Sequence, residues 1–220
     1  MRFLGAIKNS LLDIVFPTQC LSCGQSGTDL CEGCLLDSPT AERECAKWIF
    51  PLYDYRHPPV KRAVWLLKYK GKKNLANIFA EALYGRILEE LADLHVLENF
   101  REPMLIPVPL SPGRYLERGY NQAELICKAL IRVDNDQNFK LINNVLSKPI
   151  NTVHQAHIEN RSKRLKNIVG SFSIKNEEQI KGKNIILIDD VITTGATLSE
   201  AKKILKQYGA RKVIAFTVAH

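Results

Sequence analysis

The chain has 220 residues, of which 45% are hydrophobic, 25% charged and 8% aromatic. These proportions are typical of folded globular proteins, and they exclude an intrinsically disordered chain, which has too few apolar residues to form a core. No stretch approaches the roughly 20 uncharged apolar residues that a spanning helix needs, so the sequence predicts no transmembrane segment.

The charge of the chain is unevenly distributed. Basic residues exceed acidic ones by 8, and the whole excess lies after residue 110. Cations also gather at 61–73, where Lys61, Lys68 and Lys72 are spaced to share one helix face, and at 161–166. Such clusters are often solvated helix faces. Two of them together favour polyanionic partners, namely phosphorylated small molecules or nucleic acid.

Residues 2–16 place apolar side chains three and four positions apart, which predicts an amphipathic helix that docks on the protein itself. Peripheral membrane binding is the less favoured alternative, because the polar face is not strongly basic. Lys8 and Asp13 interrupt the apolar run and no small-residue cleavage site follows, so this is not a secretory signal. We therefore expect a cytoplasmic protein that could reach the inner face of the membrane through partners.

Residues 17–50 contain five of the six cysteines and little apolar periodicity, so this segment cannot build a core of its own. In a reducing cytoplasm, cysteines are interpreted as ligands before they are interpreted as disulfides. Four of them form two Cys-x-x-Cys pairs, and four thiolates at the corners of a tetrahedron suit Zn²⁺. The sequence predicts one structural zinc site, with Gly24 and Gly33 supplying backbone freedom. Its ligands are Cys20, Cys23, Cys31 and Cys34.

Other uses of the cysteines stay open at this point. The same four sulfurs could hold an iron–sulfur cluster. A thioredoxin-like redox pair is less favoured, because neither Cys-x-x-Cys sits between a strand and a helix. Cys45 is either a spare ligand or a lone thiol, and Cys127 lies on an apolar helix face, where it is expected to be a core residue.

The chain after residue 50 alternates between helical and strand-like patterns. Residues 58–98 predict one or two helices, and helical spacing returns at 122–131 and 197–208. Apolar runs of strand length occupy 104–110, 184–189 and 212–218, with a short candidate at 172–174. Uninterrupted apolar strands between helices are typical of parallel strands buried on both faces. We expect an α/β fold over residues 51–220, a twisted parallel sheet flanked by helices, after a small zinc-binding module in 1–50.

The strongest chemical signal is the segment IILIDDVITTGATL at 185–198. Asp189 and Asp190 end an apolar strand, and the chain then turns directly into a helix whose first N–H groups suit a phosphate monoester. Adjacent carboxylates would repel phosphate, so they suit the paired hydroxyls of a ribose ring. No Gly-Lys-Ser/Thr follows, which excludes a Walker loop. The predicted phosphate ligands are Thr193, Thr194, Gly195, Ala196 and Thr197, and a branched side chain at Gly195 is expected to fill the phosphate's space.

The segment LIDDVITTGAT resembles the phosphoribosyl-diphosphate (PRPP) loop of type I phosphoribosyltransferases. Further features narrow the match: the paired Cys-x-x-Cys motifs, residues 68–71, 106–110 and 118–122, and Arg114, Gln155, Arg164, Asn167 and Phe172. With these, essentially the whole chain resembles the ComF family of competence-associated phosphoribosyltransferase-like proteins. Many members carry cysteines beyond the first four, whereas this chain has only Cys45 there, which leaves one metal site.

By this resemblance, Asp189 and Asp190 hold the ribose hydroxyls and residues 193–197 bind the 5′-phosphate. The turn after 105–109 resembles a diphosphate-binding loop, and 114–122 resembles a flexible loop that closes over the diphosphate. When diphosphate leaves, cationic groups and Mg²⁺ must stabilise the negative charge that develops. Arg114 and Arg118 could supply positive charge for this, and Gly113 and Gly119 are candidate hinges of the loop.

Three functions remain in competition. In the favoured one, a ComF-like protein binds PRPP or a related phosphoribosyl ligand and assists the uptake and handling of single-stranded DNA in natural transformation, with a competence helicase as candidate partner. Tyr69, Tyr115 and Tyr120 in a basic groove could hold such a strand. The alternatives are a genuine nucleobase or amido phosphoribosyltransferase and a non-catalytic PRPP-sensing regulator. The sequence specifies no acceptor, so turnover is not predicted either way.

Overall fold

The computed structural model describes residues 18–42, 45–135, 137–149 and 170–220. The helix expected at 2–16 and the basic cluster at 161–166 lie outside the described residues, as do Gln155, Arg164 and Asn167. Within the described part, no helix has both the length and the apolar character needed to span a membrane.

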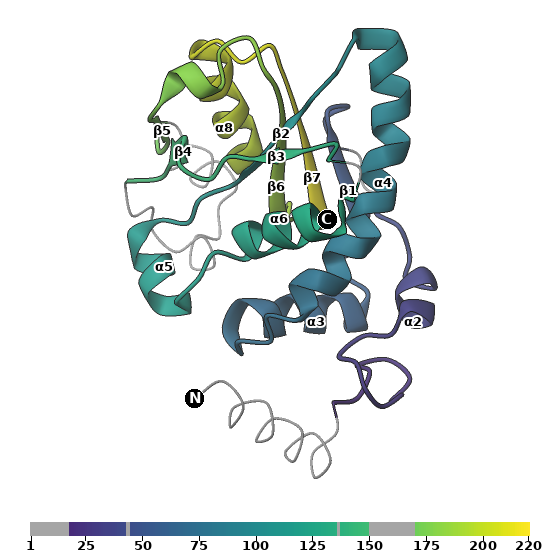
Figure 1. The fold of residues 1–220 in the computed structure, drawn as a ribbon. Helices are drawn as coiled ribbons and strands as arrows, with labels where there is room; N and C mark the ends of the chain where they lie inside the picture. Colours follow the sequence, from purple (N-terminus) through teal and green to yellow (C-terminus); the bar gives the residue numbers. More distant parts are fainter. Residues whose placement is uncertain (1–17, 43–44, 136, 150–169) are drawn as a thin grey trace, which may run out of the picture.

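A five-stranded parallel sheet occupies the centre of the molecule (Figure 1). The apolar runs at 104–110, 184–189 and 212–218 form its three middle strands, which confirms the predicted α/β fold. Its two edge strands have no counterpart among the predicted strands. In order across the sheet, the strands are β1 (Ile49–Tyr53), β7 (Lys212–Ala219), β6 (Asn184–Val191), β2 (Met104–Pro107) and β3 (Lys140–Leu141).

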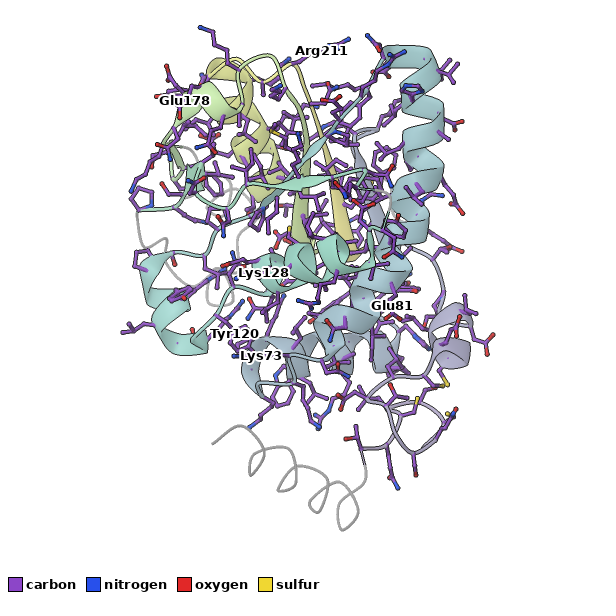
Figure 2. All side chains as sticks on the ribbon, in the orientation of Figure 1. Lys73, Glu81, Tyr120, Lys128, Glu178 and Arg211 are labelled. Atoms are coloured by element: carbon purple, nitrogen blue, oxygen red, sulfur yellow. The ribbon has the colours of Figure 1, made fainter. Side chains whose placement is uncertain are left out.

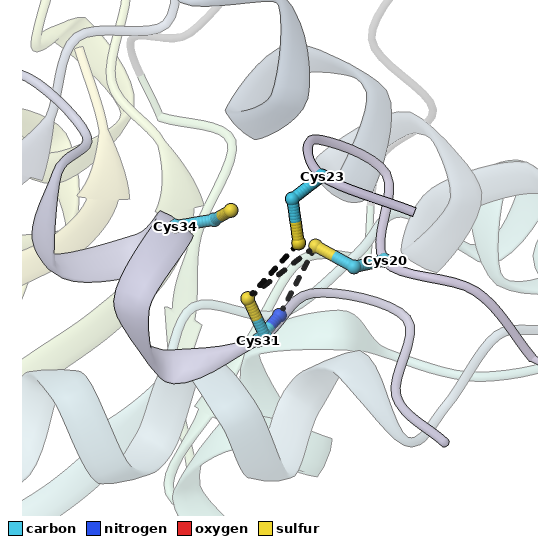
Figure 3. Close-up of side chains that lie close together, drawn as sticks. All are labelled: Cys20, Cys23, Cys31 and Cys34. Carbon is cyan, nitrogen blue, oxygen red and sulfur yellow. Dashed lines mark hydrogen bonds between the residues drawn. The ribbon is translucent and has the colours of Figure 1, made fainter. Parts of the chain in front are cut away.

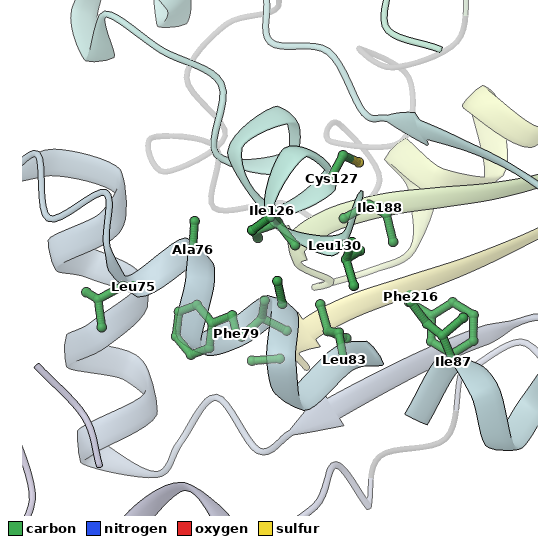
Figure 4. Packing of buried hydrophobic residues seen from close by; sticks show 14 of the residues in the cluster. Leu75, Ala76, Phe79, Leu83, Ile87, Ile126, Cys127, Leu130, Ile188 and Phe216 are labelled. Atoms are coloured by element: carbon green, nitrogen blue, oxygen red, sulfur yellow. The ribbon is translucent and has the colours of Figure 1, made fainter. Parts of the chain in front are cut away.

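Helices cover both faces of this sheet. The predicted helices at 58–98, 122–131 and 197–208 are confirmed, and the first is two helices. Three of them pack on one face, where Phe79 and Leu130 contact the side of the sheet that carries Ile188 and Phe216 (Figure 4). The fourth packs on the other face. The first three are α3 (Pro58–Tyr69), α4 (Leu75–Glu98) and α6 (Gln122–Val133), and the fourth is α8 (Ala196–Gln207).

Strand β6 shows the alternation that a strand buried on both faces must have. Ile186 and Ile188 belong to the core beneath α4 and α6, whereas Ile185 and Leu187 belong to the core beneath α8. Successive side chains of a strand point to opposite faces. The same alternation continues at the next two residues of the strand, Asp189 and Asp190.

Several short elements complete the described fold. The expected strand at 172–174 forms, but as part of a separate antiparallel pair and not of the parallel sheet. Residues 112–118 form a short helix in place of the loop expected from the resemblance. These elements are α2 (Glu32–Leu36), α5 (Pro112–Arg118), β4 (Leu146–Ser147), β5 (Ser173–Ile174) and the 3₁₀ turn η2 (Glu177–Gln179).

The cysteine-rich segment packs against the body of the protein. Leu30 and Leu35 are buried in the same core as α3 and α4. An ion pair of 3.1 Å between Asp29 and Lys72 also ties the segment to the turn after α3. The division of the chain at residue 50 stays a prediction, and β1 begins at Ile49, just before that point.

Candidate functional site

A cavity of about 360 Å³ opens at the carboxyl edge of the parallel sheet. Its walls come from the segments that follow β1, β2 and β6, together with α3 and α5. This is the edge at which parallel sheets place their ligands, because the connections after the strands diverge there. Tyr115 and Tyr120 do not line it. The residues predicted to bind PRPP or to act in catalysis all line this one cavity: Arg114, Arg118, Asp189, Asp190, Thr193, Thr194, Gly195, Ala196 and Thr197.

The turn from β6 into α8 has the form of an anion-binding helix start. Gly195 precedes α8 with a φ of 74°, a left-handed conformation that glycine adopts without strain. The Ala196 N–H donates to the Thr194 hydroxyl at 3.4 Å, and the other first-turn N–H groups have no earlier carbonyl within the helix. The loop can therefore offer both N–H and hydroxyl groups to a phosphate.

Gly195 is constrained by its backbone conformation. A Cβ built on Gly195 would lie 3.5 Å from Ile192 Cδ1 and 3.7 Å from Ile49 Cδ1, which are ordinary van der Waals contacts. The positive φ is therefore the constraint that the structure shows at this position. The expectation that a branched side chain would fill the phosphate's space stays a prediction.

The two aspartates at the end of β6 have different surroundings. Asp190 continues the row of Ile186 and Ile188 toward α3, and its Oδ1 forms a 2.8 Å ion pair with Lys68 Nζ. Both side chains are largely buried, with 10% and 16% of their surfaces exposed. Asp189 continues the opposite row, and its Oδ1 accepts the N–H of Asp190 at 2.8 Å. The two carboxylates are neighbours in the chain, but a strand directs them to opposite sides.

Charge and burial shift the pKa values of Asp189 and of the nearby Lys148. Burial and the nearby charge of Asp190 raise the pKa of Asp189 to about 7, although Lys68 and Lys148 act in the opposite direction. Burial and the charge of Arg114 lower the pKa of Lys148, while Asp189 opposes that change. Asp189 therefore titrates near neutrality, and a ligand that needs its ionised form competes with a proton.

Two lysines of the cavity were not predicted from the sequence to belong to it. Lys148 is only 7% exposed, its Nζ lies 5.1 Å from the centre of the Phe172 ring, and it lines the cavity beside Arg114. No local pattern in the segment LSKP points to it. Lys68 carried part of the family resemblance, and a partner 122 positions away cannot be deduced from helical spacing.

The lysine cluster at 61–73 does not form a single face. Helix α3 ends at Tyr69, and Gly71 continues the chain with a φ of 68°, so Lys72 lies beyond the helix. Lys68 turns into the cavity toward Asp190, and Lys72 pairs with Asp29. The expected common face of Lys61, Lys68 and Lys72 is therefore wrong, because the left-handed turn ends the helical spacing before residue 72.

The two arginines of the expected flexible loop, Arg114 and Arg118, both lie within helix α5. Ser111 precedes this helix, Pro112 opens it and Gly119 ends it with a φ of 74°, so Gly119 serves as a helix terminator and Gly113 lies within the helix. The Arg118 guanidinium donates to Gln122 Oε1 at 2.9 Å and to the Tyr69 hydroxyl at 3.3 Å. These contacts hold Arg118 at the edge of the cavity.

The four predicted cysteine ligands come together (Figure 3). Their sulfur atoms all lie within 4.8 Å of one another, and Cys31 Sγ is 3.7 Å from Cys20 Sγ and 3.6 Å from Cys23 Sγ. A tetrahedral ion with metal–sulfur bonds of about 2.3 Å needs sulfurs about 3.8 Å apart. The cluster could therefore hold one metal ion.

Details of the cysteine cluster refine the expectations. Gly24 has a φ of 77° and allows the first turn, but Gly33 lies inside α2 without such a conformation, so the role given to Gly33 is wrong. Burial opposes ionisation of Cys20, yet N–H groups from Cys31, Cys23 and Ser22 outweigh it and lower its pKa to about 6. Cys45 stands outside the cluster, where its thiol donates to the Ile49 carbonyl at 3.1 Å, and Cys127 is a buried core residue as predicted.

Comparison with known proteins finds a matching domain family and several similar proteins. The phosphoribosyl transferase domain family matches residues 134–220. The chain is 27% identical over 199 residues to competence protein F of Haemophilus influenzae, an alignment that covers 87% of this chain and 81% of that protein. It is 28% identical over 199 residues to the DNA utilization protein YhgH of Escherichia coli O157:H7, with coverages of 89% and 81%. It is 34% identical over 151 residues to competence protein ComFC of Streptococcus pneumoniae, with coverages of 69% and 59%.

Proposed function

Because the chain belongs to the ComF family of phosphoribosyltransferase-like proteins, we propose that it binds PRPP, or a related phosphoribosyl ligand, and assists the handling of single-stranded DNA in natural transformation. The observation that carries the ligand is the cavity that joins the 193–197 loop to four cations and two carboxylates. The names of the relatives, competence protein and DNA utilization protein, support the DNA role.

The charges around the cavity support a polyanionic ligand. Asp189 and Asp190 are opposed there by four cations, so the formal charge of the lining is positive even when both carboxylates are ionised. Opposite charge attracts the ligand over several ångströms and stabilises it once bound. The four cations are Lys68, Arg114, Arg118 and Lys148.

Each part of the proposed ligand has a matching part of the cavity. The 5′-phosphate takes the N–H and hydroxyl groups of the 193–197 loop. The ribose hydroxyls donate to Asp189 and Asp190, and the diphosphate lies toward Arg114 and Arg118, against the segment after β2. Mg²⁺ prefers oxygen ligands, and a carboxylate of this pair could hold it, where it would supply further positive charge for the diphosphate.

The cysteine cluster has a separate, structural role in this proposal. Four thiolates fill all four positions of a tetrahedral Zn²⁺ and leave none for a substrate. The cluster lies beside Leu30 and Leu35 in the core, and so a zinc ion there would hold the N-terminal segment on α3 and α4.

The experiment that separates a binding protein from a transferase measures the release of diphosphate from PRPP. Purified protein with Mg²⁺ is offered a panel of nucleobases and amides. Release at enzymatic rates of about 1 s⁻¹ or more with one acceptor would establish a genuine phosphoribosyltransferase and favour that function over the DNA-handling role. Binding of PRPP without release for any acceptor would support a ligand-binding role.

The affinity for PRPP and Mg²⁺ is expected to fall as the pH drops below about 7. Asp189, whose pKa is raised to about 7, must lose its proton to accept a ribose hydroxyl. Binding is then at full strength above pH 7 and weakens by up to about tenfold per pH unit below it. Titration calorimetry between pH 6 and 8 measures this dependence.

The matched variant for this pH dependence is Asp189→Asn, which has no proton to lose. Its affinity should be lower at pH 8 and nearly flat with pH, apart from the titration of the ligand's own phosphates. In the ligand-free wild type the sign is reversed for this group. The contribution of Asp189 to the free energy of unfolding is fully present below about pH 4 and is lost as the pH rises through 7, because only the unfolded chain releases this proton near 3.8. An equally steep dependence in wild type and variant would contradict the assignment.

Substitution of Gly195 by alanine is expected to cost about 1–2 kcal/mol of folding free energy, because its φ of 74° is unfavourable for a residue with a Cβ. Gly182→Ala is the control, since Gly182 has a φ of 73°, lies away from the cavity and has no atom within 4 Å of a built Cβ. Urea unfolding should show similar losses for both. Strain at Gly195 would displace the N–H groups that the loop offers to the phosphate, so only Gly195→Ala should also weaken PRPP binding. Equal binding by both variants would contradict the loop's role.

A further inference from the structure

The outer face of α3 carries aromatic rings in contact with cations. Trp65 and Tyr69 are one helical turn apart, their ring centres are 6.1 Å apart, and 36% and 49% of their surfaces are exposed. The Arg62 guanidinium and the Lys70 ammonium lie 4.9 and 5.4 Å from the centre of the Trp65 ring. The opposite face of α3 is the one that packs in the core, and so the fold does not require a tryptophan here.

The same arrangement continues past the end of the helix. The Lys73 ammonium lies 4.7 Å from the centre of the Tyr120 ring, and Figure 2 shows these two side chains close together beside α3. The Tyr120 hydroxyl donates to the Leu67 carbonyl, which fixes the ring against α3. We call this surface the α3 strip; it consists of Arg62, Trp65, Tyr69, Lys70, Lys73 and Tyr120.

The α3 strip is connected to the phosphoribosyl cavity. Tyr69 lines the cavity, and the Arg118 guanidinium lies 5.1 Å from the Tyr69 ring while it also lines the cavity. One aromatic side chain thus belongs to both surfaces. A chain molecule that lies along the strip would reach the opening of the cavity.

The cations of the strip differ from the lysines beside them. Lys68 and Lys72 are paired with Asp190 and Asp29. Among the residues that the structure describes, Arg62, Lys70 and Lys73 have no carboxylate partner. The sequence from 55 to 80 contains no acidic residue. The strip therefore offers its positive charge to a partner from outside the described chain.

The chemistry of the strip selects one kind of partner. Unpaired bases stack on exposed aromatic rings while lysine and arginine contact the phosphates, and this combination is typical of single-strand binding. A duplex hides its base faces. A helix that lies in a lipid surface needs a broad exposed apolar face beside its cations, to which aliphatic side chains also contribute. Every aliphatic side chain between residues 60 and 70 is buried or half-buried.

We propose that the α3 strip is the surface on which single-stranded DNA binds, with bases stacked on Trp65 and Tyr69 and phosphates held by Arg62, Lys70 and Lys73. The proposal rests on the DNA-handling role proposed above and assigns that role to a surface. The strand then runs toward the cavity that holds the phosphoribosyl ligand.

The test measures binding of a fluorescein-labelled oligothymidylate, longer than a site of roughly 4–16 nucleotides, by fluorescence anisotropy at several salt concentrations. Trp65→Ala is expected to weaken binding about tenfold or more. The double variant Arg62→Gln/Lys70→Gln is expected to reduce the slope of log affinity against log salt by about 0.7 for each phosphate that the protein no longer neutralises. Both variants should keep the wild-type melting temperature and its increase with PRPP and Mg²⁺.

Two controls match the chemistry of these variants at places away from the strip. Tyr208→Ala removes an aromatic ring with 41% of its surface exposed at the end of α8. Lys181→Gln/Lys183→Gln removes two exposed positive charges near η2. Both controls should bind the strand with wild-type affinity.

A second readout reports stacking directly. The chain has two tryptophans, so in a Trp48→Phe protein the fluorescence comes from Trp65 alone. Stacking of a base on Trp65 should quench this fluorescence when oligothymidylate is added, whereas polyglutamate of equal charge should not. Equal responses to both polymers would show contact by charge alone and would overturn the proposal.

The remaining outcomes distinguish a failure of the α3 strip proposal from a failure of the proposed function. If wild type and both strip variants bind the strand equally well, the α3 strip is the wrong surface and the DNA-handling role stands. If the wild type does not bind the strand at low salt, both the strip and direct DNA handling fail. Binding to vesicles with anionic lipids in place of the strand would also overturn the proposal. Loss of the PRPP response in the wild type would remove the proposed ligand and leave the strip unaffected.

Discussion

The Asp190→Asn variant is expected to lose the thermal stabilisation that PRPP and Mg²⁺ give to the wild-type protein. At a ligand concentration of about 100 times the dissociation constant, the wild type should gain about 2.7 kcal/mol. This gain corresponds to an increase in melting temperature of roughly 5–10 °C for a chain of this size. Asp190 is 7% exposed and bonded to Lys68, and a neutral amide offers a ribose hydroxyl a much weaker acceptor.

Two further variants make this result interpretable. Asp190→Asn also leaves Lys68 without its partner, so its ligand-free melting temperature is measured as well. Thr194→Ala removes a hydroxyl from the loop without touching that ion pair, and it should lose most of the stabilisation too. Asp93→Asn, an exposed position on α4, is the control and should respond like the wild type. A wild-type response in Asp190→Asn would contradict the ribose assignment.

Loss of the metal from the cysteine cluster is expected to lower the melting temperature by about 10 °C or more. The reason is that Leu30 and Leu35, with 1% and 6% of their surfaces exposed, are buried in the main core by this segment. Each contributes roughly 1.5–3 kcal/mol through its burial, and a chain of this size loses about 2–4 °C for each kcal/mol. Cys31→Ser should unfold residues 18–42 first, as followed by hydrogen exchange.

The control for this variant is Cys45→Ser. Cys45 lies outside the cluster, and its thiol donates to the Ile49 carbonyl, a bond that a serine hydroxyl can also make. This variant should retain about one zinc per chain by elemental analysis, whereas Cys31→Ser should retain little. Freshly isolated, reduced wild-type protein without stoichiometric metal would refute the site.

The parts of the fold that the sequence predicts best are the long, periodic ones. Strands β6 and β7 and helix α8 follow directly from an apolar run, a turn and a helical pattern. The edge strands escaped prediction for physical reasons: β3 has two residues, and β1 contains Pro51, a residue that usually argues against a strand. Their positions depend on pairing with β2 and β7, which no local pattern encodes.

The candidate site likewise combines residues that the local sequence predicts with residues whose positions depend on contacts between distant segments. The loop at 193–197 and both aspartates are readable because strand, turn and helix follow one another in sequence. The different directions of Asp189 and Asp190 could also have been deduced, from the alternation of side chains along a strand. The place of Lys148 in the cavity and the pairing of Lys68 could not have been deduced from the sequence. Both depend on segments that meet only in the folded protein.

The structure has helix α5 where the resemblance implied a flexible loop. The resemblance to a flexible loop outweighed signals that were present in the segment: a serine before the first turn, Pro112 at its start and Gly119 at its end. Those residue types favour a short helix at that position. Arg114 and Arg118 are thus presented by a helix, which fixes their spacing along one side of the cavity.

The most direct test of the central claim is a calorimetric titration of PRPP with Mg²⁺ into the ligand-free protein and into Thr194→Ala. The proposed phosphoribosyl cavity predicts saturable binding of about one PRPP per chain in the wild type and loss of that binding in the variant. It also predicts weaker binding of ribose 5-phosphate, which lacks the diphosphate that Arg114 and Arg118 are proposed to contact. Absence of binding to the wild type at millimolar PRPP, or equal binding by Thr194→Ala, would contradict it.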